Sequence, residues 1–158
     1  AASDARSSQG VRISTRRFTR LLSFFEGMPV ATPGDTATAQ LPVTEERIEA
    51  FASVTGDDNP LHLDPEYASE SLFDGPVAHG MLPAGAISSA LAELPGDIVY
   101  VSQDLSFDRP VRPGETIEAT VTVADRLDGD MLRVETTAAA DGEPAVTGTA
   151  TVLSEPHE

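Results

Sequence analysis

Residues 80–94 read GMLPAGAISSALAEL, and this stretch has no charged side chain before Glu93. It is long enough for a helix, and a helix that is apolar on most sides must be covered on most sides by the rest of the molecule. Pro95 and Gly96 follow, a pair that ends helices. The stretch therefore predicts one central buried helix.

Segments with the character of strands follow this helix. Between Thr116 and Leu127 the residues alternate, with Ile117, Ala119 and Val121 on the apolar face. Turn sequences rich in Gly, Asp and Pro separate the segments. The predicted strands are 98–107, 116–127, 131–140 and 146–153. A four-stranded antiparallel sheet that wraps one helix is an α+β arrangement with the helix against one sheet face.

Shorter elements are expected before the central helix. Residues 36–43 alternate loosely, as in an edge strand. Thr44 suits the N-cap of a short helix that ends at Gly56, because Glu45 and Glu46 follow where the helix dipole favours acids. Residues 57–64 are predicted as a polar loop, and Pro65 can begin a short helical turn through Ala68.

Composition limits the class of protein. A length of 158 residues allows one domain with a sizeable core. The absence of cysteine excludes disulfides and thiolate zinc sites. No apolar run approaches the eighteen or so residues of a membrane span. We therefore expect a soluble cytoplasmic protein.

The charge is strongly negative, with 26 acidic residues, 10 arginines and no lysine. Residues 28–158 carry 24 of the acids and five of the arginines, a net charge of −19. Such a surface repels nucleic acid and anionic membranes, so neither is an expected partner. The composition resembles that of cytoplasmic proteins from extreme halophiles; the alternative is a merely acidic protein encoded by GC-rich DNA.

Residues 1–23 differ from the rest, because they are rich in Ser and Arg and poor in acids. This composition fits a mitochondrial transit peptide or a solvated basic arm. The acidic body argues against an organellar origin. We expect a poorly ordered basic arm over 1–23 and one domain over 24–154.

Two short segments carry the chemistry. Residues 56–62, GDDNPLH, place Asp57 and His62 five residues apart on a tight loop, and residues 79–81, HGM, open the buried helix. An acid and a base can hold one water between them, and a helix N-terminus can hold a carbonyl oxygen that gains charge. This combination suits the addition of water to an activated double bond.

The same residues carry a resemblance to a known family. Residues 51–64, FASVTGDDNPLHLD, followed by HGML at 79–82, resemble the MaoC-like dehydratases, and most of all the (R)-specific enoyl-CoA hydratases. The segment 107–116, FDRPVRPGET, also matches the family. The resemblance covers roughly residues 25–153.

The resemblance implies a hot-dog fold, a long helix wrapped by an antiparallel sheet, in a homodimer whose sheets join edge to edge. It implies syn hydration of a trans-2-enoyl-CoA thioester to the (R)-3-hydroxyacyl product. Asp57 and His62 match the catalytic pair, the Gly80 N–H matches the donor to the thioester carbonyl, and Ser88 matches a helix serine near the pair. Pro83 departs from the aliphatic residue of many relatives, but proline is tolerated in a first helical turn.

Roles within the site follow from these assignments. His62 suits the base that takes the water proton, and Asp57 then returns a proton to the α-carbon, although the two roles can also be exchanged. Asn59, with Pro60, is expected to shape the loop, and His79 to bond that loop to the helix entry. No metal is expected, since His62, Asp64 and His79 lack a recognised ligand spacing. No cofactor is expected beyond the CoA of the substrate.

Other functions stay open at this point. One is a dehydratase of branched or dicarboxylic acyl-CoA, or of acyl carrier protein, although acidic carriers suit this acidic chain poorly. Another is a hot-dog module that binds acyl-CoA without turnover. The pathway is expected to be polyhydroxyalkanoate synthesis or fatty-acid oxidation. Arg109 and Arg112 are candidates for contact with the CoA phosphates, with solvation as the alternative for each.

Overall fold

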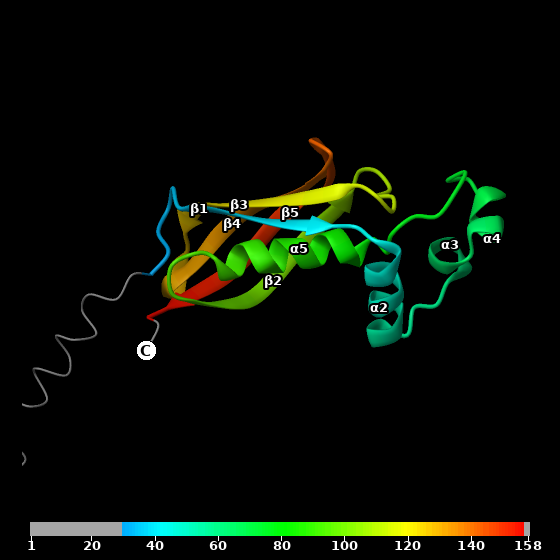
Figure 1. Ribbon diagram of the computed structural model, residues 1–158. Coiled ribbons are helices and arrows are strands. Elements are labelled where there is room, and N and C mark those ends of the chain that lie inside the picture. Colours follow the sequence, from blue (N-terminus) through cyan, green and yellow to red (C-terminus); the bar gives the residue numbers. More distant parts are fainter. Residues whose placement is uncertain (1–29, 157–158) are drawn as a thin grey trace, which may run out of the picture.

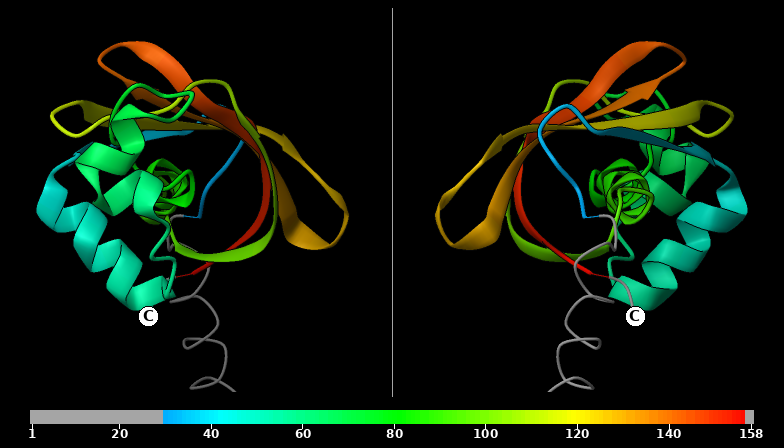
Figure 2. Two further views of the ribbon diagram at one scale, coloured as in Figure 1. Left: turned by 90° about the vertical axis from the view of Figure 1, so that its right-hand side faces the viewer. Right: turned by 90° about the vertical axis from the view of Figure 1, so that its left-hand side faces the viewer.

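The computed structural model describes residues 30–156, and its central element is the helix α5, Met81–Ala92. Seven of its twelve residues are buried: Leu82, Pro83, Ala84, Ala86, Ile87, Ala90 and Leu91. Figure 2 shows α5 end-on, with the strands curving around it. The predicted central helix is confirmed, and burial accounts for the lack of charge at these seven positions. The other five positions, Met81, Gly85, Ser88, Ser89 and Ala92, are exposed in this chain.

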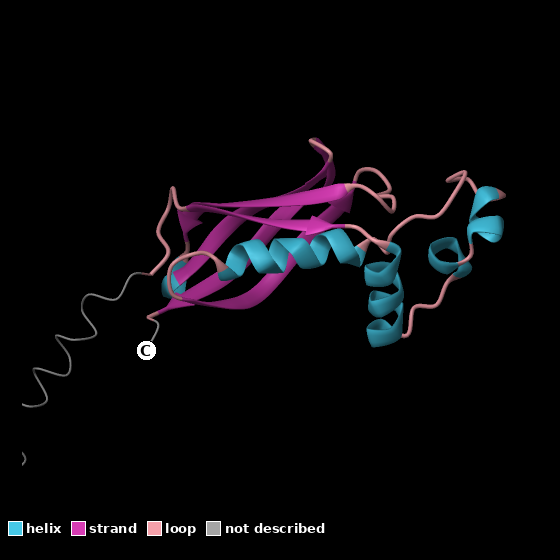
Figure 3. Ribbon diagram, viewed as in Figure 1, coloured by secondary structure: helices cyan, strands magenta, loops and turns pink. Residues whose placement is uncertain are grey.

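Five strands form the sheet that covers α5. They are β1 (Thr36–Pro42), β2 (Asp97–Phe107), β3 (Thr116–Arg126), β4 (Met131–Ala140) and β5 (Glu143–Glu155). Their order in the sheet is β1-β3-β4-β5-β2, and every neighbouring pair is antiparallel. The expected α+β arrangement, with the helix against one face of the sheet, is therefore confirmed (Figure 3).

Alternation along the strands decides which side chains face α5. On β3, Ile117, Ala119, Val121 and Val123 are buried, as their period of two predicts. β5 starts three residues before the predicted residue 146, because Glu143 already pairs with Ala140 across the turn. The core is thus a single cluster between the helix and the concave sheet face.

One glycine allows β2 and β5 to approach closely. A Cβ at Gly148 would lie 1.9 Å from the carbonyl oxygen of Asp104 on β2, a distance at which the strands would have to separate. Nearby, the pairing of β2 with β5 shifts between Tyr100 and Ser102, so Val101 forms a bulge. The edge strand β2 is therefore held to its neighbour through a site that tolerates no side chain.

Three short helices lie beyond the N-terminal end of α5 (Figure 1). They are α2 (Glu45–Thr55), α3 (Pro60–Leu63) and α4 (Pro65–Ser69). The Thr44 side chain accepts a hydrogen bond from the Arg47 N–H and so caps α2 as predicted. The prediction of a plain loop over 57–64 was wrong, because α3 lies within it.

The predicted basic arm, residues 1–23, lies outside the described residues. Within residues 30–156, no helix is long and apolar enough to cross a membrane.

Candidate active site

Local hydrogen bonds set the conformation of the segment that carries Asp57. Gly56 ends α2 with a φ of 76°, a left-handed conformation that favours glycine, and its N–H donates to the Ala52 carbonyl. The Asp57 N–H donates to Thr55 Oγ1, and Asp57 Oδ1 accepts from the Asn59 N–H at 3.4 Å. The chain therefore turns sharply after α2, and the Asp57 side chain is left exposed.

The short helix α3 positions His62. Asn59 Oδ1 accepts from the Leu61 N–H and so caps α3, with Pro60 at its first position, where proline is favoured. The ring of His62 is anchored through Nδ1, which lies 2.7 Å from the Val77 carbonyl oxygen. A carbonyl oxygen only accepts, so Nδ1 carries the hydrogen, and Nε2 of the neutral ring has a free lone pair.

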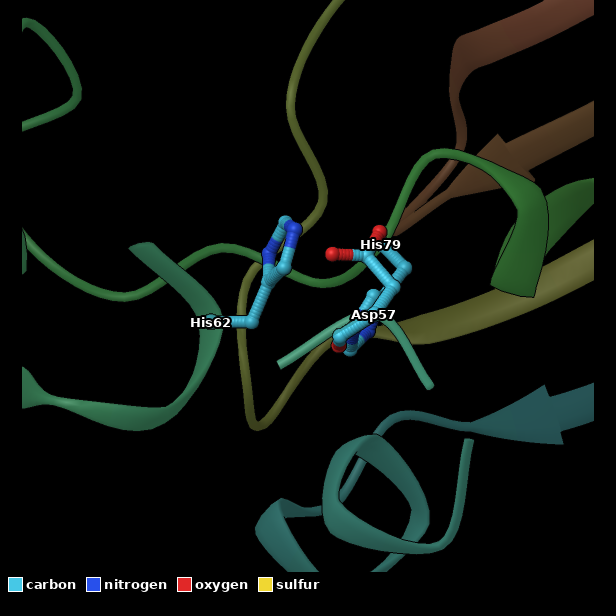
Figure 4. Close-up of side chains that lie close together, drawn as sticks. All are labelled: Asp57, His62 and His79. Atoms are coloured by element: carbon cyan, nitrogen blue, oxygen red, sulfur yellow. The ribbon is translucent and has the colours of Figure 1, made fainter. Parts of the chain in front are cut away.

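The free side of His62 faces Asp57. Figure 4 shows the carboxylate of Asp57 and the ring of His62 turned toward each other. A carboxylate oxygen of Asp57 and a ring nitrogen of His62 lie within 4.8 Å of one another. That separation accommodates one water hydrogen-bonded to both groups. The structure thus brings together the two residues that the loop spacing singled out.

His79 joins this loop to the start of α5. Its ring is 2% exposed, and its Nε2 lies 2.8 Å from the Asp57 carbonyl oxygen, to which the Nε2–H donates. The ring also lies against His62, with centroids 3.9 Å apart and 32° between the planes. Phe51 of α2 lies on it at 5.0 Å. Within the described residues His79 Nδ1 is buried without a partner.

Gly80 lies where α5 begins. Its N–H has no hydrogen-bond partner among residues 30–156, as is usual for the first N–H groups of a helix. A Cβ at this position would lie 3.1 Å from Cε1 of Phe107, so the bare glycine lets the end of β2 come close. The free N–H is a donor suited to an oxygen that gains negative charge.

Two cavities meet at Gly80 and Phe107. The larger, about 460 Å³, is lined on its apolar side by Leu61, Val77, Pro83 and Val146, and His62 lies in its wall. The smaller, about 300 Å³, is lined by Phe51, Thr55, Asp57, His79 and Met81. Asp57 and His62 therefore open onto different cavities, and Gly80 borders both.

The three polar side chains at this point could also ligate a metal. Asp57, His62 and His79 each offer one ligand atom within 4.8 Å of the others. One nitrogen of each ring is already committed to a backbone carbonyl, however, and the two rings lie against each other at 3.9 Å, which restricts how they can turn toward one ion. Zinc ligands must converge at about 2.0–2.1 Å in a tetrahedron, so this arrangement suits a bound water better.

Ser88 and Arg109 lie apart from the reacting groups. Ser88 is exposed in the middle of α5 and lines neither cavity within the described chain. Arg109 lines the larger cavity, but its guanidinium donates to Glu115 at 2.9 Å and to the Pro110 and Ala140 carbonyls. The hydrogen bond to Glu115 raises the pKa of this guanidinium, against the opposing effect of burial.

Sequence reasoning missed the anchor of His62, the Val77 carbonyl. Every residue carries a carbonyl group, so no side-chain pattern marks this one. It also missed the contact between the tilted rings of His62 and His79, since the two lie seventeen residues apart and meet only where α3 lies near the entry to α5.

The chain is similar in sequence to a known protein family and to one of its enzymes. A family model described as the MaoC like domain matches residues 29–143. The chain is 38% identical over 136 residues to the (R)-specific enoyl-CoA hydratase of Rhodospirillum rubrum, covering 84% of this chain and 92% of that protein.

Two solved structures resemble the fold closely. R-hydratase PhaJ1 from Pseudomonas aeruginosa has a TM-score of 0.74 and 34% identity, with 80% of this chain and 83% of that chain covered. The (R)-hydratase from Aeromonas caviae, described as involved in PHA biosynthesis, has a TM-score of 0.73 and 33% identity, with 77% and 96% covered. The expected hot-dog fold is thereby confirmed.

Proposed function

The chain belongs to the MaoC-like dehydratase family, and we propose that it adds water reversibly to trans-2-enoyl-CoA to give (R)-3-hydroxyacyl-CoA. The names of the relatives support the substrate class and the (R) configuration. The observation that carries the proposal is the facing pair, Asp57 and His62, beside the free N–H of Gly80.

The first step adds a hydroxyl group to the β-carbon. His62 Nε2 takes a proton from the water held between His62 and Asp57, because its Nδ1–H is committed to Val77 and its lone pair is free. The electron pair of the double bond moves toward the thioester carbonyl, whose oxygen becomes an enolate. The Gly80 N–H donates to that oxygen, and one such donor is worth about 3–4 kcal/mol in comparable sites.

The second step delivers a proton to the α-carbon. The proton that His62 took from the water passes to the Asp57 carboxylate, and Asp57 gives it to the α-carbon as the enolate collapses, which restores the thioester carbonyl. Both groups thereby recover their starting states, a neutral imidazole and a carboxylate. Because both act from one side of the double bond, the addition is syn.

The test is hydration of crotonyl-CoA, followed as loss of absorbance at the enoyl-thioester band. We expect turnover at molar KCl, unchanged by EDTA because the proposed steps use no metal or further cofactor. Chiral analysis should give the (R) product. The (S) product, or no turnover with enoyl-CoA substrates of four to eight carbons, would contradict the proposal.

The proposed context is cytoplasmic, in polyhydroxyalkanoate synthesis or fatty-acid oxidation. The Aeromonas caviae relative, an (R)-hydratase involved in PHA biosynthesis, supports the first of these two pathways. No observed feature of the described residues favours turnover of branched or dicarboxylic substrates, or binding without turnover, over this assignment.

We also propose that two copies join along β2. This strand lies at one end of the sheet, and its Val99, Tyr100 and Val101 are 49%, 41% and 51% exposed. An apolar edge strand favours pairing with another strand. Analytical ultracentrifugation should give a dimer for the natural chain and a monomer for Val101→Glu. A dimer of unchanged affinity in the variant would place the interface elsewhere.

A further inference from the structure

We propose that Arg112 binds a phosphate group of the CoA moiety at the rim of the larger cavity; this inference rests on the proposed function. CoA carries a pyrophosphate and a 3′-phosphate, and an enzyme for CoA thioesters has to place these anions on a body with a net charge of −19 over residues 28–158. Lysine is absent, so only arginines can supply a side-chain cation that stays charged at neutral pH.

Three of the five arginines in residues 30–156 are already neutralised by carboxylates. Arg126 pairs with Asp130 at 3.6 Å, and Arg133 pairs with Asp125. Arg109 is paired with Glu115 at 2.9 Å and lies 3.7 Å from Glu143. Its guanidinium is thus enclosed by acids and carbonyls. Arg109 therefore joins the loop before β3 to the end of β4 and is not available to an anion.

Arg47 and Arg112 differ from these three, because neither has a carboxylate within 4.0 Å of its guanidinium in the described part of the chain. Both side chains are exposed. Arg47 donates to the Pro42 carbonyl beside α2, and neither residue lines a cavity of the site. Arg47 therefore has the same chemistry as Arg112, but its guanidinium is held at the Pro42 carbonyl, which lines neither cavity.

Arg112 lies beside the larger cavity. It follows Val111, which lines the cavity, and its guanidinium donates to the carbonyl of Phe73, another lining residue. That single bond holds the side chain at the rim and leaves most of its five N–H donors for a ligand. The planar fork of a guanidinium matches two phosphate oxygens at once.

The acids near this rim explain why the cation is needed. Asp108 is exposed and lines the same cavity, and Asp74 directly follows Phe73. Without Arg112, a phosphate that approached this rim would meet these two carboxylates, and the arginine that lines the cavity, Arg109, is already paired with Glu115. Arg112 is thus assigned a role in substrate affinity and none in the chemical step.

The experiment compares two thioesters that share the crotonyl group, crotonyl-CoA and crotonyl-N-acetylcysteamine, which has no phosphate. Arg112→Gln should raise KM for crotonyl-CoA about tenfold, equal to about 1.4 kcal/mol. It should leave kcat, and both constants for the N-acetylcysteamine ester, within about twofold. Arg47→Gln, the matched control, should change neither substrate's constants. Crotonyl-dephospho-CoA lacks only the 3′-phosphate of CoA. If Arg112→Gln still raises KM for this ester, Arg112 binds the pyrophosphate; if it does not, Arg112 binds the 3′-phosphate.

Two outcomes would overturn the assignment. An equal change for both esters would show that Arg112 acts through the Phe73 loop, and no change for either would show that the phosphates bind elsewhere. If Arg112→Gln does not fold, Arg112→Lys keeps a cation without the fork and should give an intermediate rise in KM for crotonyl-CoA alone. If the natural chain hydrates neither ester, the proposed function fails instead.

Discussion

Asp57 and His62 share one water in the proposed reaction, so their substitutions should not be additive. Asp57→Asn and His62→Gln should each lower kcat by about 10²–10⁴-fold, because each removes a proton-transfer group. The double variant should be hardly slower than the worse single one, since groups that act as a unit fail together. Steady-state kinetics and thermal unfolding of all three variants measure this. Multiplicative losses would mean that the two residues act on different waters.

The contact between Gly80 and Phe107 should make their substitutions depend on each other. Gly80→Ala keeps the backbone N–H but adds a Cβ 3.1 Å from the Phe107 ring, which displaces the donor. We expect kcat/KM to fall by about tenfold to a hundredfold, as for small misplacements in other sites. Phe107→Ala removes the crowding atom, so the same substitution should cost much less in that background. Equal costs in both backgrounds would assign the loss to the helix start itself.

For single residues, the sequence predicted which side chains form the site better than it predicted the partners that these side chains contact. The spacing from Asp57 to His62 was readable, because Asn59 and Pro60 shape the turn within the same few residues. The resemblance places Ser88 near the pair, and in the described chain it is exposed and lines neither cavity, so its role stays a prediction. The partners of His62 and His79 come from distant segments, and no local pattern reports them.

Among the helices and strands, those with a long periodic pattern of apolar residues were predicted best. The strands β3 and β4 alternate over ten or more residues, and on β3 the period alone identified the face that is buried. The helix α3 has four residues, too few for any period, and depends on the Asn59 cap and on Pro60. The order β1-β3-β4-β5-β2 also lay beyond the sequence, because it depends on which edges meet.

Tyr100 lies on the edge strand β2, and its phenol titrates differently in the folded and the unfolded chain. Burial raises the pKa of the Tyr100 phenol above 10.0, and its hydroxyl donates to Gln103 Oε1 at 2.9 Å, a bond that the phenolate cannot make. The unfolded chain therefore loses this proton at lower pH than the folded chain. Stability should be unaffected by Tyr100 below pH 10 and should fall as the pH rises from there toward the folded pKa.

Absorbance titration can test this directly, because the chain has two tyrosines and no tryptophan. Tyr67→Phe leaves Tyr100 as the sole phenol, and its midpoint should lie above 10 in the folded variant and near 10 in guanidinium. Tyr100→Phe should lose less stability than the natural chain between pH 9 and 11. Coincident midpoints in the two states would contradict a desolvated Tyr100.

For the whole molecule, the net negative charge is the feature that should make stability depend most on salt. Residues 28–158 have a net charge of −19 with no lysine, and three of the arginines in the described part are paired with acids. At about 0.1 M salt the Debye length is near 10 Å, so acids on neighbouring strands repel, whereas at about 1 M it is near 3 Å. Folding concentrates this charge, so screening should stabilise the folded state more than the unfolded chain.

Thermal unfolding should therefore show a Tm that rises from low to molar KCl, with activity rising in parallel. Sucrose at matched water activity is the control, because it strengthens burial without screening charge. A Tm that responds to sucrose and KCl equally, or to neither, would favour the plain acidic composition over a halophilic one.

All the groups of the proposed site come from residues 57–80 of one chain, and the Asp57 carbonyl, His62 and His79 contact each other within it. This has a genetic consequence. In a cell that carries one Asp57→Asn allele and one His62→Gln allele, subunits mix freely if the protein assembles. No mixed assembly would contain an intact site, because each chain brings its own defect. The two alleles should therefore fail to complement, whereas a site divided between subunits would recover activity from the mixture.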